Sequence, residues 1–305
     1  MASSSRLAQP RRRRSSDAVR WKYGILFATD ATRMHEVRQA LLCLEDARVR
    51  LPVAVQCYPP NPGCQVHLPS NLSFSVDVQK EEDLLDKHLR PNKGGRMHKA
   101  VAVYHSPFRY TLFMDTDTCV LSPRLREMFA PLKDFDFVSV WECCAEVHGT
   151  SLTYGWGWEP NTGVFALRRS ARQLMMDWYH LFMASREHYE KTGSKDQQAM
   201  LDQLRLNKSY SFFPMPATFN FRRFTMPFAG SGSGRLHDGV VVLHPTHSQM
   251  KMRSSSRGNA SKQIEQIASW FAKDITSSAR RGRGEAGAVD MDSESSSNSR
   301  VAVGE

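Results

Sequence analysis

The sequence predicts an α/β fold, a single domain in which helices flank a mixed, mostly parallel sheet, with a disordered tail at each end. Two short apolar runs, 23–29 and 53–58, have the length of buried strands. Between them, apolar residues recur at helical spacing from 33 to 47, which predicts an amphipathic helix. A strand, a helix and a strand in this order form a βαβ unit, whose two strands are parallel.

The remaining elements follow from the same two patterns. Residues 59–80 are rich in Pro, Asn and Ser and predict a loop or an irregular strand. Beyond them, the apolar patterns predict four more strands and three more helices. The strands are expected at 110–114, 135–141, 163–167 and 240–243, and the helices at 96–105, 169–189 and 196–204.

The two ends differ in composition from the middle, so we expect the folded domain to span residues 21–251. Residues 1–20 hold six arginines and one acid and are predicted to be a disordered basic leader. Residues 252–305 are predicted to be a Ser/Arg-rich tail with one short helix at 260–273. The net charge of +10 favours an anionic partner, but the leader alone carries +5 and residues 21–251 carry +4. The domain itself therefore needs no more than a small anionic ligand.

The chain shows neither a membrane span nor a zinc-binding pattern. No run approaches the roughly 18 apolar residues that a spanning helix needs, and residues 1–20 lack the apolar stretch of a secretory signal. The six cysteines form no CxxC or Cys/His spacing. We expect buried thiols, with Cys57 and Cys64 as the only plausible local disulfide.

The sharpest chemical signal is the pair Asp115 and Asp117, directly after the apolar run 110–114. In an extended chain, residues i and i+2 point the same way, and parallel sheets bind ligands at the carboxyl ends of their strands. Two neighbouring carboxylates repel unless a cation lies between them, which predicts a divalent-metal site. The alternative is a solvated strand end.

A phosphatase is an alternative interpretation of the same residues. With Thr118, the pair reads DxDxT, which resembles the nucleophile motif of haloacid-dehalogenase-like phosphatases. Those enzymes need a later acidic pair to complete their magnesium site. Between Asp117 and the tail, the acids are scattered and form no such pair.

Four further segments fit one family. Lys99 lies sixteen positions before Asp115, and the others follow in the order Asn161-Thr162-Gly163-Val164-Phe165, Asp196-Gln197 and His244. This order and spacing resemble the nucleotide-diphospho-sugar glycosyltransferases of the GT-A (Rossmann-like) fold, especially the group of glycogenin and galactinol synthase. The resemblance covers most of residues 21–251. It implies transfer of a sugar from a nucleotide-sugar donor, with a UDP-sugar expected, to a glycan, protein or small-molecule acceptor.

The resemblance also implies a metal cofactor, Mn²⁺ or Mg²⁺, held by Asp115, Asp117 and His244. Mixed carboxylate and imidazole ligands suit manganese better than calcium. A dication at this place neutralises the charge that develops on the leaving diphosphate. The alternative for His244 is a structural histidine before Pro245.

The remaining site residues are assigned by the same resemblance. Asp196 and Gln197 are the expected catalytic pair beside the anomeric carbon, although Asp196 could instead be a helix N-cap. The donor is expected to contact Thr29, Asp30, Lys99, Asp115, Thr116, Asp117, Asn161, Gly163 and Lys251. Asp30 has an N-cap alternative and Lys99 a surface-lysine alternative. Lys251 departs from the family, in which a Gly and then a Lys commonly follow the histidine.

The stereochemistry and the wider class stay open at this point. Retention, which we expect, needs no general base, so Asp196 and Gln197 would orient or stabilise the sugar. Inversion would need a carboxylate base, Asp196 or Glu142. The rival classes are a nucleic-acid-binding protein that uses the arginine-rich leader and a degenerate relative without turnover. As it stands the chain is expected to be soluble and cytoplasmic, or in the Golgi lumen if an N-terminal anchor is missing.

Overall fold

The computed structural model describes residues 20–58, 69, 71–80, 97–143, 158–191, 196–220 and 239–244. The predicted leader up to residue 19, the tail with its helix at 260–273, and Lys251 lie outside these residues. The domain boundaries therefore stay predictions.

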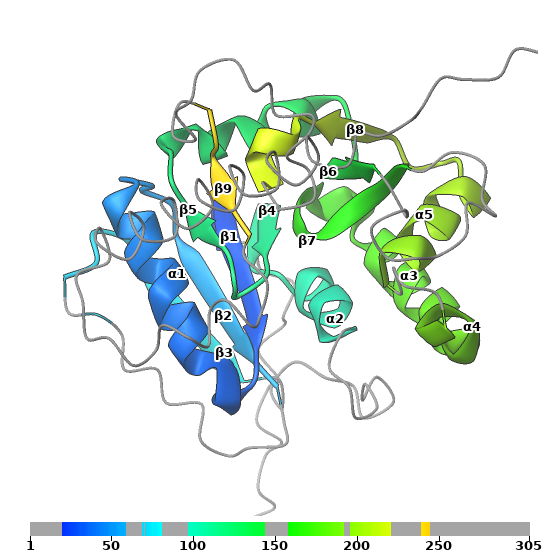
Figure 1. Ribbon diagram of the computed structural model, residues 1–305, viewed down its shortest axis with the longest axis horizontal. Helices are drawn as coiled ribbons and strands as arrows, with labels where there is room; N and C mark the ends of the chain where they lie inside the picture. The colour runs from blue at the N-terminus through cyan, green and yellow to red at the C-terminus, as the bar shows by residue number, and fades with distance from the viewer. Residues whose placement is uncertain are drawn as a thin grey trace, which may run out of the picture. The chain divides into compact units, whose positions relative to one another are not determined.

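A seven-stranded mixed sheet forms the centre of the fold (Figure 1). Its strand order is β3-β2-β1-β4-β7-β6-β8. Neighbouring strands are parallel except for β7, which runs antiparallel to both β4 and β6. The strands are β1 Trp21–Thr29, β2 Val53–Cys57, β3 Val76–Lys80, β4 Phe108–Met114, β6 Phe137–Cys143, β7 Trp158–Arg168 and β8 Phe212–Met215. The predicted mixed, mostly parallel sheet is confirmed.

A second, two-stranded sheet lies beside the first. It pairs β5 Cys119–Val120 with β9 Val242–Leu243 in antiparallel register. Cys119 is opposite Leu243, and Val120 is opposite Val242. This short ladder brings the residue after β9 back to the residues that follow β4.

Helices cover both faces of the large sheet. The α-helices are α1 Met34–Asp46, α2 His98–Tyr104, α3 Gln173–Ala184, α4 Arg186–Lys191 and α5 Asp196–Leu206. The 3₁₀ helices are η1 Ala31–Arg33, η4 Pro123–Phe129, η5 Pro131–Lys133, η7 Arg169–Ala171 and η8 Ala217–Asn220. Figure 1 shows α1 apart from α2, α3 and α5, which lie together on the other side of the central strands.

Alternation along the strands explains the two apolar layers. In β1, Ile25 and Phe27 pack with α1 and η4, whereas Leu26, between them, packs with α2 and α3. The same alternation places Phe113 of β4 against Phe165 of β7 on the α3 face, with ring centroids 5.1 Å apart. Each fully buried side chain of this size contributes about 1.5–3 kcal/mol to stability. The sheet is therefore buried on both faces, as the continuous apolar runs predict.

Several local predictions need correction. The strand β3 lies at the end of residues 59–80, for which the sequence predicted either a loop or an irregular strand. The strands β5 and β8 were not predicted at all. The predicted helix 169–189 is divided into η7, α3 and α4, with Ser185 as the C-cap of α3. The predicted strand 240–243 is paired only at its last two residues.

The cysteine prediction was wrong for one pair. Cys43 of α1 and Cys119 of β5 form a disulfide with Cα atoms 5.4 Å apart, across 76 residues of sequence. Cys57 is disulfide-bonded as well, and its expected partner Cys64 lies outside the described residues. Spacing along the chain cannot reveal the first pair, because the fold brings the two residues together.

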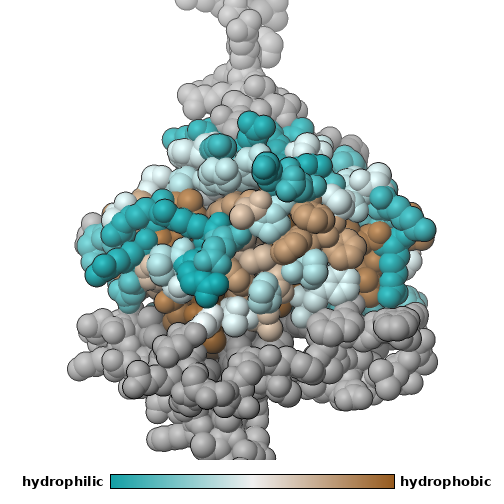
Figure 2. Space-filling view, turned by 90° about the horizontal axis from the view of Figure 1, so that it is seen from above, coloured by the Kyte–Doolittle hydropathy of each residue, from teal (hydrophilic) through white to brown (hydrophobic). Residues whose placement is uncertain are grey.

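Two surface properties complete the description. Within the described residues, no helix is long and apolar enough to cross a membrane. On the face shown in Figure 2, hydrophobic residues gather in the middle, with hydrophilic residues above them and on both sides.

Candidate functional site

The site begins at the turn that follows β4. Asp115 directly follows the strand, and residues 116 and 117 form a turn in which the backbone N–H and the hydroxyl of Thr118 both donate to the Asp115 carbonyl. The two carboxylates therefore meet across a tight turn and not along an extended strand, which corrects the sequence argument. The result for the carboxylates is the same, since both lie at the carboxyl end of β4.

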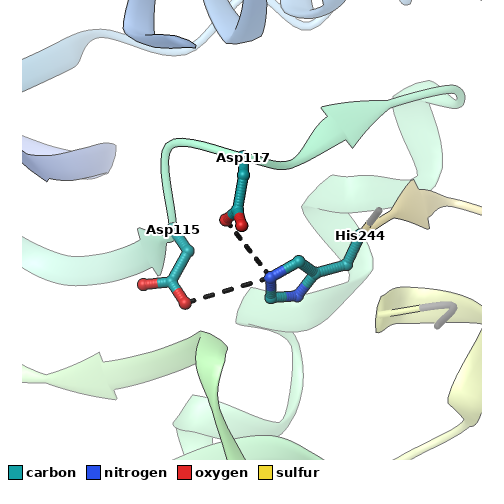
Figure 3. Close-up of side chains that lie close together, drawn as sticks. All are labelled: Asp115, Asp117 and His244. Carbon is teal, nitrogen blue, oxygen red and sulfur yellow. Dashed lines mark ion pairs between the residues drawn. The ribbon is translucent and has the colours of Figure 1, made fainter. Parts of the chain in front are cut away.

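His244 completes the cluster from the residue after β9. Its Nε2 lies 3.3 Å from Oδ1 of Asp117 and 4.0 Å from Oδ2 of Asp115. One ligand atom from each of the three residues lies within 4.8 Å of the others, and Figure 3 shows the three side chains pointing toward one another. His244 is 3% exposed and Asp117 9%, whereas the side chain of Asp115 is 31% exposed, so Asp115 is the member of the cluster that is open to solvent. These are the three residues that the sequence predicts as metal ligands.

Asn220, in η8, orients the histidine. Its Oδ1 lies 2.9 Å from Nδ1 of His244. In this contact the carbonyl oxygen accepts from Nδ1 of the matching tautomer, and Nε2 is the ring nitrogen on the side of the carboxylates. Asn220 is fully buried, and its amide nitrogen has no hydrogen-bond partner in the part of the chain that the structure describes. A buried donor without a partner lowers the stability of the fold by about 1–3 kcal/mol. The gain that would offset this cost is the orientation of His244 by the same side chain.

Gly163 makes room for the cluster. A Cβ at this position would lie 2.6 Å from Oδ2 of Asp115 and 2.6 Å from Cε1 of His244. The backbone of Gly163 also accepts a 2.6 Å hydrogen bond from the amide of Asp115. A side chain here would thus displace the Asp115 carboxylate or the His244 ring. The sequence predicts Gly163 as a site residue, and the geometry gives the physical reason.

A second polar cluster contains Lys99 and Asp196. The Lys99 Nζ is 2.7 Å from Oδ2 of Asp196 and 3.9 Å from Oδ1 of Asp115. It also donates to the carbonyl and the hydroxyl of Thr162, both at 3.2 Å. The Thr162 hydroxyl in turn donates to Asp196 at 2.7 Å. Lys99 is therefore part of the cluster, which favours its predicted role over a surface lysine.

Asp196 and Gln197 open α5. The side chain of Asp196 is 10% exposed and forms the ion pair with Lys99, so its carboxylate faces Asp115. The indole N–H of Trp178 donates to the backbone carbonyl of Asp196 at 3.0 Å, and this hydrogen bond fixes the start of α5. Gln197 is half-buried beside it.

A third group lies on α1 and was not anticipated. Glu36 is 7% exposed and accepts from Arg33 at 2.8 Å and from the hydroxyl of Thr116. The hydroxyl of Thr116 thus points toward α1. Burial lowers the pKa of Arg33, but the hydrogen bond and charge of Glu36, with the charges of Asp117 and Asp115, raise it overall. Arg33 is a stable cation near the two aspartates.

The other predicted residues lie at the same edge of the sheet or beyond the described chain. Thr29 ends β1 and is buried, and Asp30 accepts from the amides of Thr32 and Arg33 as the N-cap of η1. The side-chain carbonyl of Asn161 accepts from the backbone amides of Gly163 and Val164 at 2.7 and 3.2 Å. These hydrogen bonds hold the backbone of β7 where it passes the site. The side chain of Glu142, the alternative base, and Lys251 are outside what the structure describes.

Carboxylates and cations meet in this part of the site. Four carboxylates lie close together, those of Glu36, Asp115, Asp117 and Asp196. Lys99 pairs with Asp196 and lies 3.9 Å from Asp115, and Arg33 pairs with Glu36. Asp115 and Asp117 are also the two carboxylates beside the imidazole. Two carboxylates and an imidazole are ligand types that suit a divalent cation.

Comparison with known proteins identifies the architecture. No family profile matches the chain, and no curated protein matches it significantly. Among solved structures, the glycosyltransferase GlyE of Streptococcus pneumoniae TIGR4 superposes with a TM-score of 0.54 at 14% identity, over 85% of this chain and 65% of GlyE. The galactosyltransferase LgtC, in complex with donor and acceptor sugar analogues, superposes with a TM-score of 0.53 at 16% identity, over 82% of this chain and 95% of LgtC.

The domain has the GT-A fold. A further structure, an active-site variant of LgtC with glutamate in place of glutamine, superposes with a TM-score of 0.52 at 15% identity, over 81% of this chain and 95% of the variant. The predicted fold is thereby confirmed. The chain spans less than two thirds of GlyE and almost all of LgtC. The narrower resemblance to glycogenin and galactinol synthase stays a prediction.

The site thus joins predicted and unpredicted residues. Asp115, Asp117, His244, Lys99, Asp196 and Gly163 lie together as expected. Asn220, Thr162, Glu36 and Arg33 were missed. Of these four, only Arg33 and Glu36 could have been found from the sequence. Residues three apart lie on the same face of a helix, and these two follow soon after the first predicted strand, so they face the end of that strand. Asn220 follows no pattern that a single sequence can display.

Proposed function

We propose that this protein is a metal-dependent glycosyltransferase that moves a sugar from a nucleotide-diphosphate donor, a UDP-sugar, to an acceptor. The observation that carries the proposal is the Asp115, Asp117 and His244 cluster at the carboxyl end of β4 in a GT-A domain. Ligands bind at this edge in open α/β sheets. GlyE and LgtC, which share the fold, are glycosyltransferases by name, and LgtC was solved with sugar analogues of its donor and acceptor.

The cluster fits a divalent ion. Two carboxylates and the neutral imidazole of His244 form a mixed oxygen and nitrogen donor set, which favours Mn²⁺, with Mg²⁺ as the second choice. When bound, such an ion supplies positive charge to the departing diphosphate. The role of the chain is to present the three ligand atoms together. Asn220 fixes the tautomer and the ring orientation of His244, and Gly163 leaves space for the carboxylate of Asp115.

Lys99 and Asp196 are assigned to the sugar. The ion pair keeps Asp196 anionic, and its carboxylate lies on the Asp115 side of α5. There it would stabilise the positive charge that develops on the sugar as the bond to phosphate breaks. Gln197, next to it, would hold the sugar by its amide, and LgtC has a glutamine in its active site by the name of its variant. This arrangement, in which Asp196 is held by Lys99, supports retention, since a general base must be free to take the proton of the acceptor.

The phosphatase alternative finds less support. It needs a second pair of acids to complete a magnesium site around Asp115. Glu36 and Asp196 are further carboxylates in this part of the described structure, and each is held by a cation and a threonine hydroxyl. The nucleic-acid alternative depends on the leader, which lies outside the described residues.

The decisive experiment is a screen of nucleotide sugars for Mn²⁺-dependent donor hydrolysis, which needs no acceptor. We expect hydrolysis of a UDP-sugar that stops when the metal is chelated. Asp117→Asn should abolish it while the circular-dichroism spectrum stays unchanged. Asp134→Asn, the same substitution at an exposed position after η5, is the matched control. Full activity of Asp117→Asn, or hydrolysis of p-nitrophenyl phosphate in place of sugar nucleotides, would overturn the assignment.

A further inference from the structure

The ion pair of Arg33 and Glu36 lies beside the candidate metal ligands and has no role in the function assigned so far. Arg33 is the last residue of η1, and Glu36 lies in the first turn of α1. Both follow β1, which runs parallel to its neighbour β4, so the two strands end at the same edge of the sheet. Asp115 and Asp117 lie at this edge.

One buried oxygen joins Arg33 to the turn after β4. Oε2 of Glu36 accepts from Nε of Arg33 at 2.8 Å and lies 2.8 Å from Nη2 of the same side chain. It also accepts from the hydroxyl of Thr116, which stands between the two aspartates in the sequence. Because one oxygen makes all these contacts, Glu36 fixes Arg33 relative to the turn that carries the predicted metal ligands.

This pair differs from an ordinary surface ion pair. Arg124 and Glu127 have the same spacing and a contact of 2.9 Å, but their side chains are 53% and 50% exposed. The side chain of Glu36 is only 8% exposed. Taking a carboxylate out of water is costly, and a buried ion pair is often no more stabilising than apolar residues of similar volume. Stability therefore does not explain why this carboxylate is buried.

The guanidinium of Arg33 interacts with the aspartates and is accessible to a ligand. Its charge is attracted by those of Asp117 and Asp115. The side chain is 33% exposed, and Glu36 engages Nε and Nη2 of a group that has five N–H donors in all. An anion that binds a metal ion at the two aspartates would therefore be attracted to this cation as well.

We propose that Arg33 binds the diphosphate of the donor beside the metal ion, and that Glu36 is the positioning residue that holds Arg33 there. The inference rests on the proposed function, because it needs a nucleoside diphosphate at Asp115 and Asp117. A guanidinium matches phosphate oxygens with paired hydrogen bonds. Toward a metal ion without its diphosphate, the same charge is repulsive. Arg33 should therefore favour binding of the diphosphate and oppose binding of the metal alone.

Two calorimetric titrations of the full chain separate these effects. MnCl₂ is titrated alone, and UDP is titrated at an Mn²⁺ concentration that saturates each protein. We expect Arg33→Gln to raise the Kd of UDP at least about tenfold, because a hydrogen-bonded charge is lost. The Kd of Mn²⁺ alone should stay unchanged or fall, because a nearby positive charge is removed. The control Arg38→Gln removes the same charge from an exposed position on α1 and should change neither Kd.

A second variant covers the case in which Arg33→Gln does not fold, since this substitution takes a cation away from a buried carboxylate. Arg33→Lys retains a positive charge beside Glu36 but lacks the planar fork. It should raise the Kd of UDP at least about threefold and leave that of Mn²⁺ unchanged. Melting curves without ligand show which of the two variants is folded and is to be compared.

The positioning role of Glu36 is tested by coupling. If Glu36 acts through Arg33, the Arg33→Gln substitution should matter less once Glu36 is already glutamine. We expect the increase in the Kd of UDP to fall from at least about tenfold to less than about threefold in the Glu36→Gln background. This comparison also removes both members of the buried ion pair together. An undiminished increase overturns the positioning role.

The outcomes distinguish this proposal from the proposed function. If the unaltered chain binds no Mn²⁺, or no UDP in its presence, the function fails and the role of Arg33 fails with it. If it binds both, two results overturn the role of Arg33 alone. One is a folded Arg33 variant that binds UDP as tightly as the unaltered chain. The other is a variant that loses affinity for Mn²⁺ and for UDP in equal measure, which is the result of a merely structural role.

Discussion

Replacing Gly163 by alanine tests whether the three predicted ligands depend on the space beside them. The new Cβ would lie 2.6 Å from both Oδ2 of Asp115 and Cε1 of His244, whereas ordinary contacts begin at 3.4 Å. The separation must therefore grow by about 0.4 Å to reach the shortest tolerated contact of 3.0 Å and by about 0.8 Å to reach an ordinary one, whereas ligand distances in metal sites hold within about 0.2 Å. The partly exposed Asp115 can turn away, but the buried His244 is held by Asn220.

We expect Gly163→Ala to weaken Mn²⁺ binding by about 10- to 100-fold, which corresponds to roughly 1.4–2.8 kcal/mol. Calorimetric titration with MnCl₂ measures the affinity, and a melting curve without metal checks that the protein is folded. Gly239→Ala is the control, because its Cβ would meet only the methyl group of Thr218 at 3.9 Å. If Gly163→Ala is folded and binds Mn²⁺ as tightly as the unaltered chain, the cluster does not hold the ion as described.

Two further predictions concern residues around the cluster. Asn220→Ala removes the acceptor of His244 Nδ1 and should lower Mn²⁺ affinity by about 10- to 100-fold with little change in the circular-dichroism spectrum, whereas an unchanged affinity would show that the ring is oriented by packing alone. Replacing both Cys43 and Cys119 by alanine opens a covalent loop across 76 residues and should lower the free energy of unfolding by up to about 4.5 kcal/mol in urea titration. A loss below about 1 kcal/mol would argue against the disulfide in solution.

The strands that could be predicted are those whose own residues form a recognisable apolar run. The apolar runs of β1, β2 and β4 are long enough to be recognised without any partner. The two residues of β5 become a strand only because β9 pairs with them, and β8 contains Pro214 and lies at the sheet edge, where proline is tolerated. Such elements are set by tertiary pairing and leave no local signal.

The site divides in the same way. Asp115, Asp117 and His244 belong to a motif with recognisable order and spacing, so they could be named from the sequence. The support of His244 by Asn220 and the Cys43–Cys119 disulfide are contacts between distant segments. Each depends on where the fold places a residue, and a single chain contains no trace of that placement. The chemistry of the ligands was therefore more predictable than the scaffold that orients them.

The two-residue ladder between β5 and β9 has a consequence for how the site is assembled. His244 reaches the aspartates through this ladder, and a ladder of two residue pairs is marginally stable on its own. The disulfide anchors β5 to α1, and a bound ion would anchor His244 to the turn after β4. The disulfide thus holds the strand that pairs with β9, and coordination would hold the residue that follows β9. In an unfolding experiment, oxidation state and metal concentration should act on the same local opening, so hydrogen exchange at Val242 and Leu243 should report both.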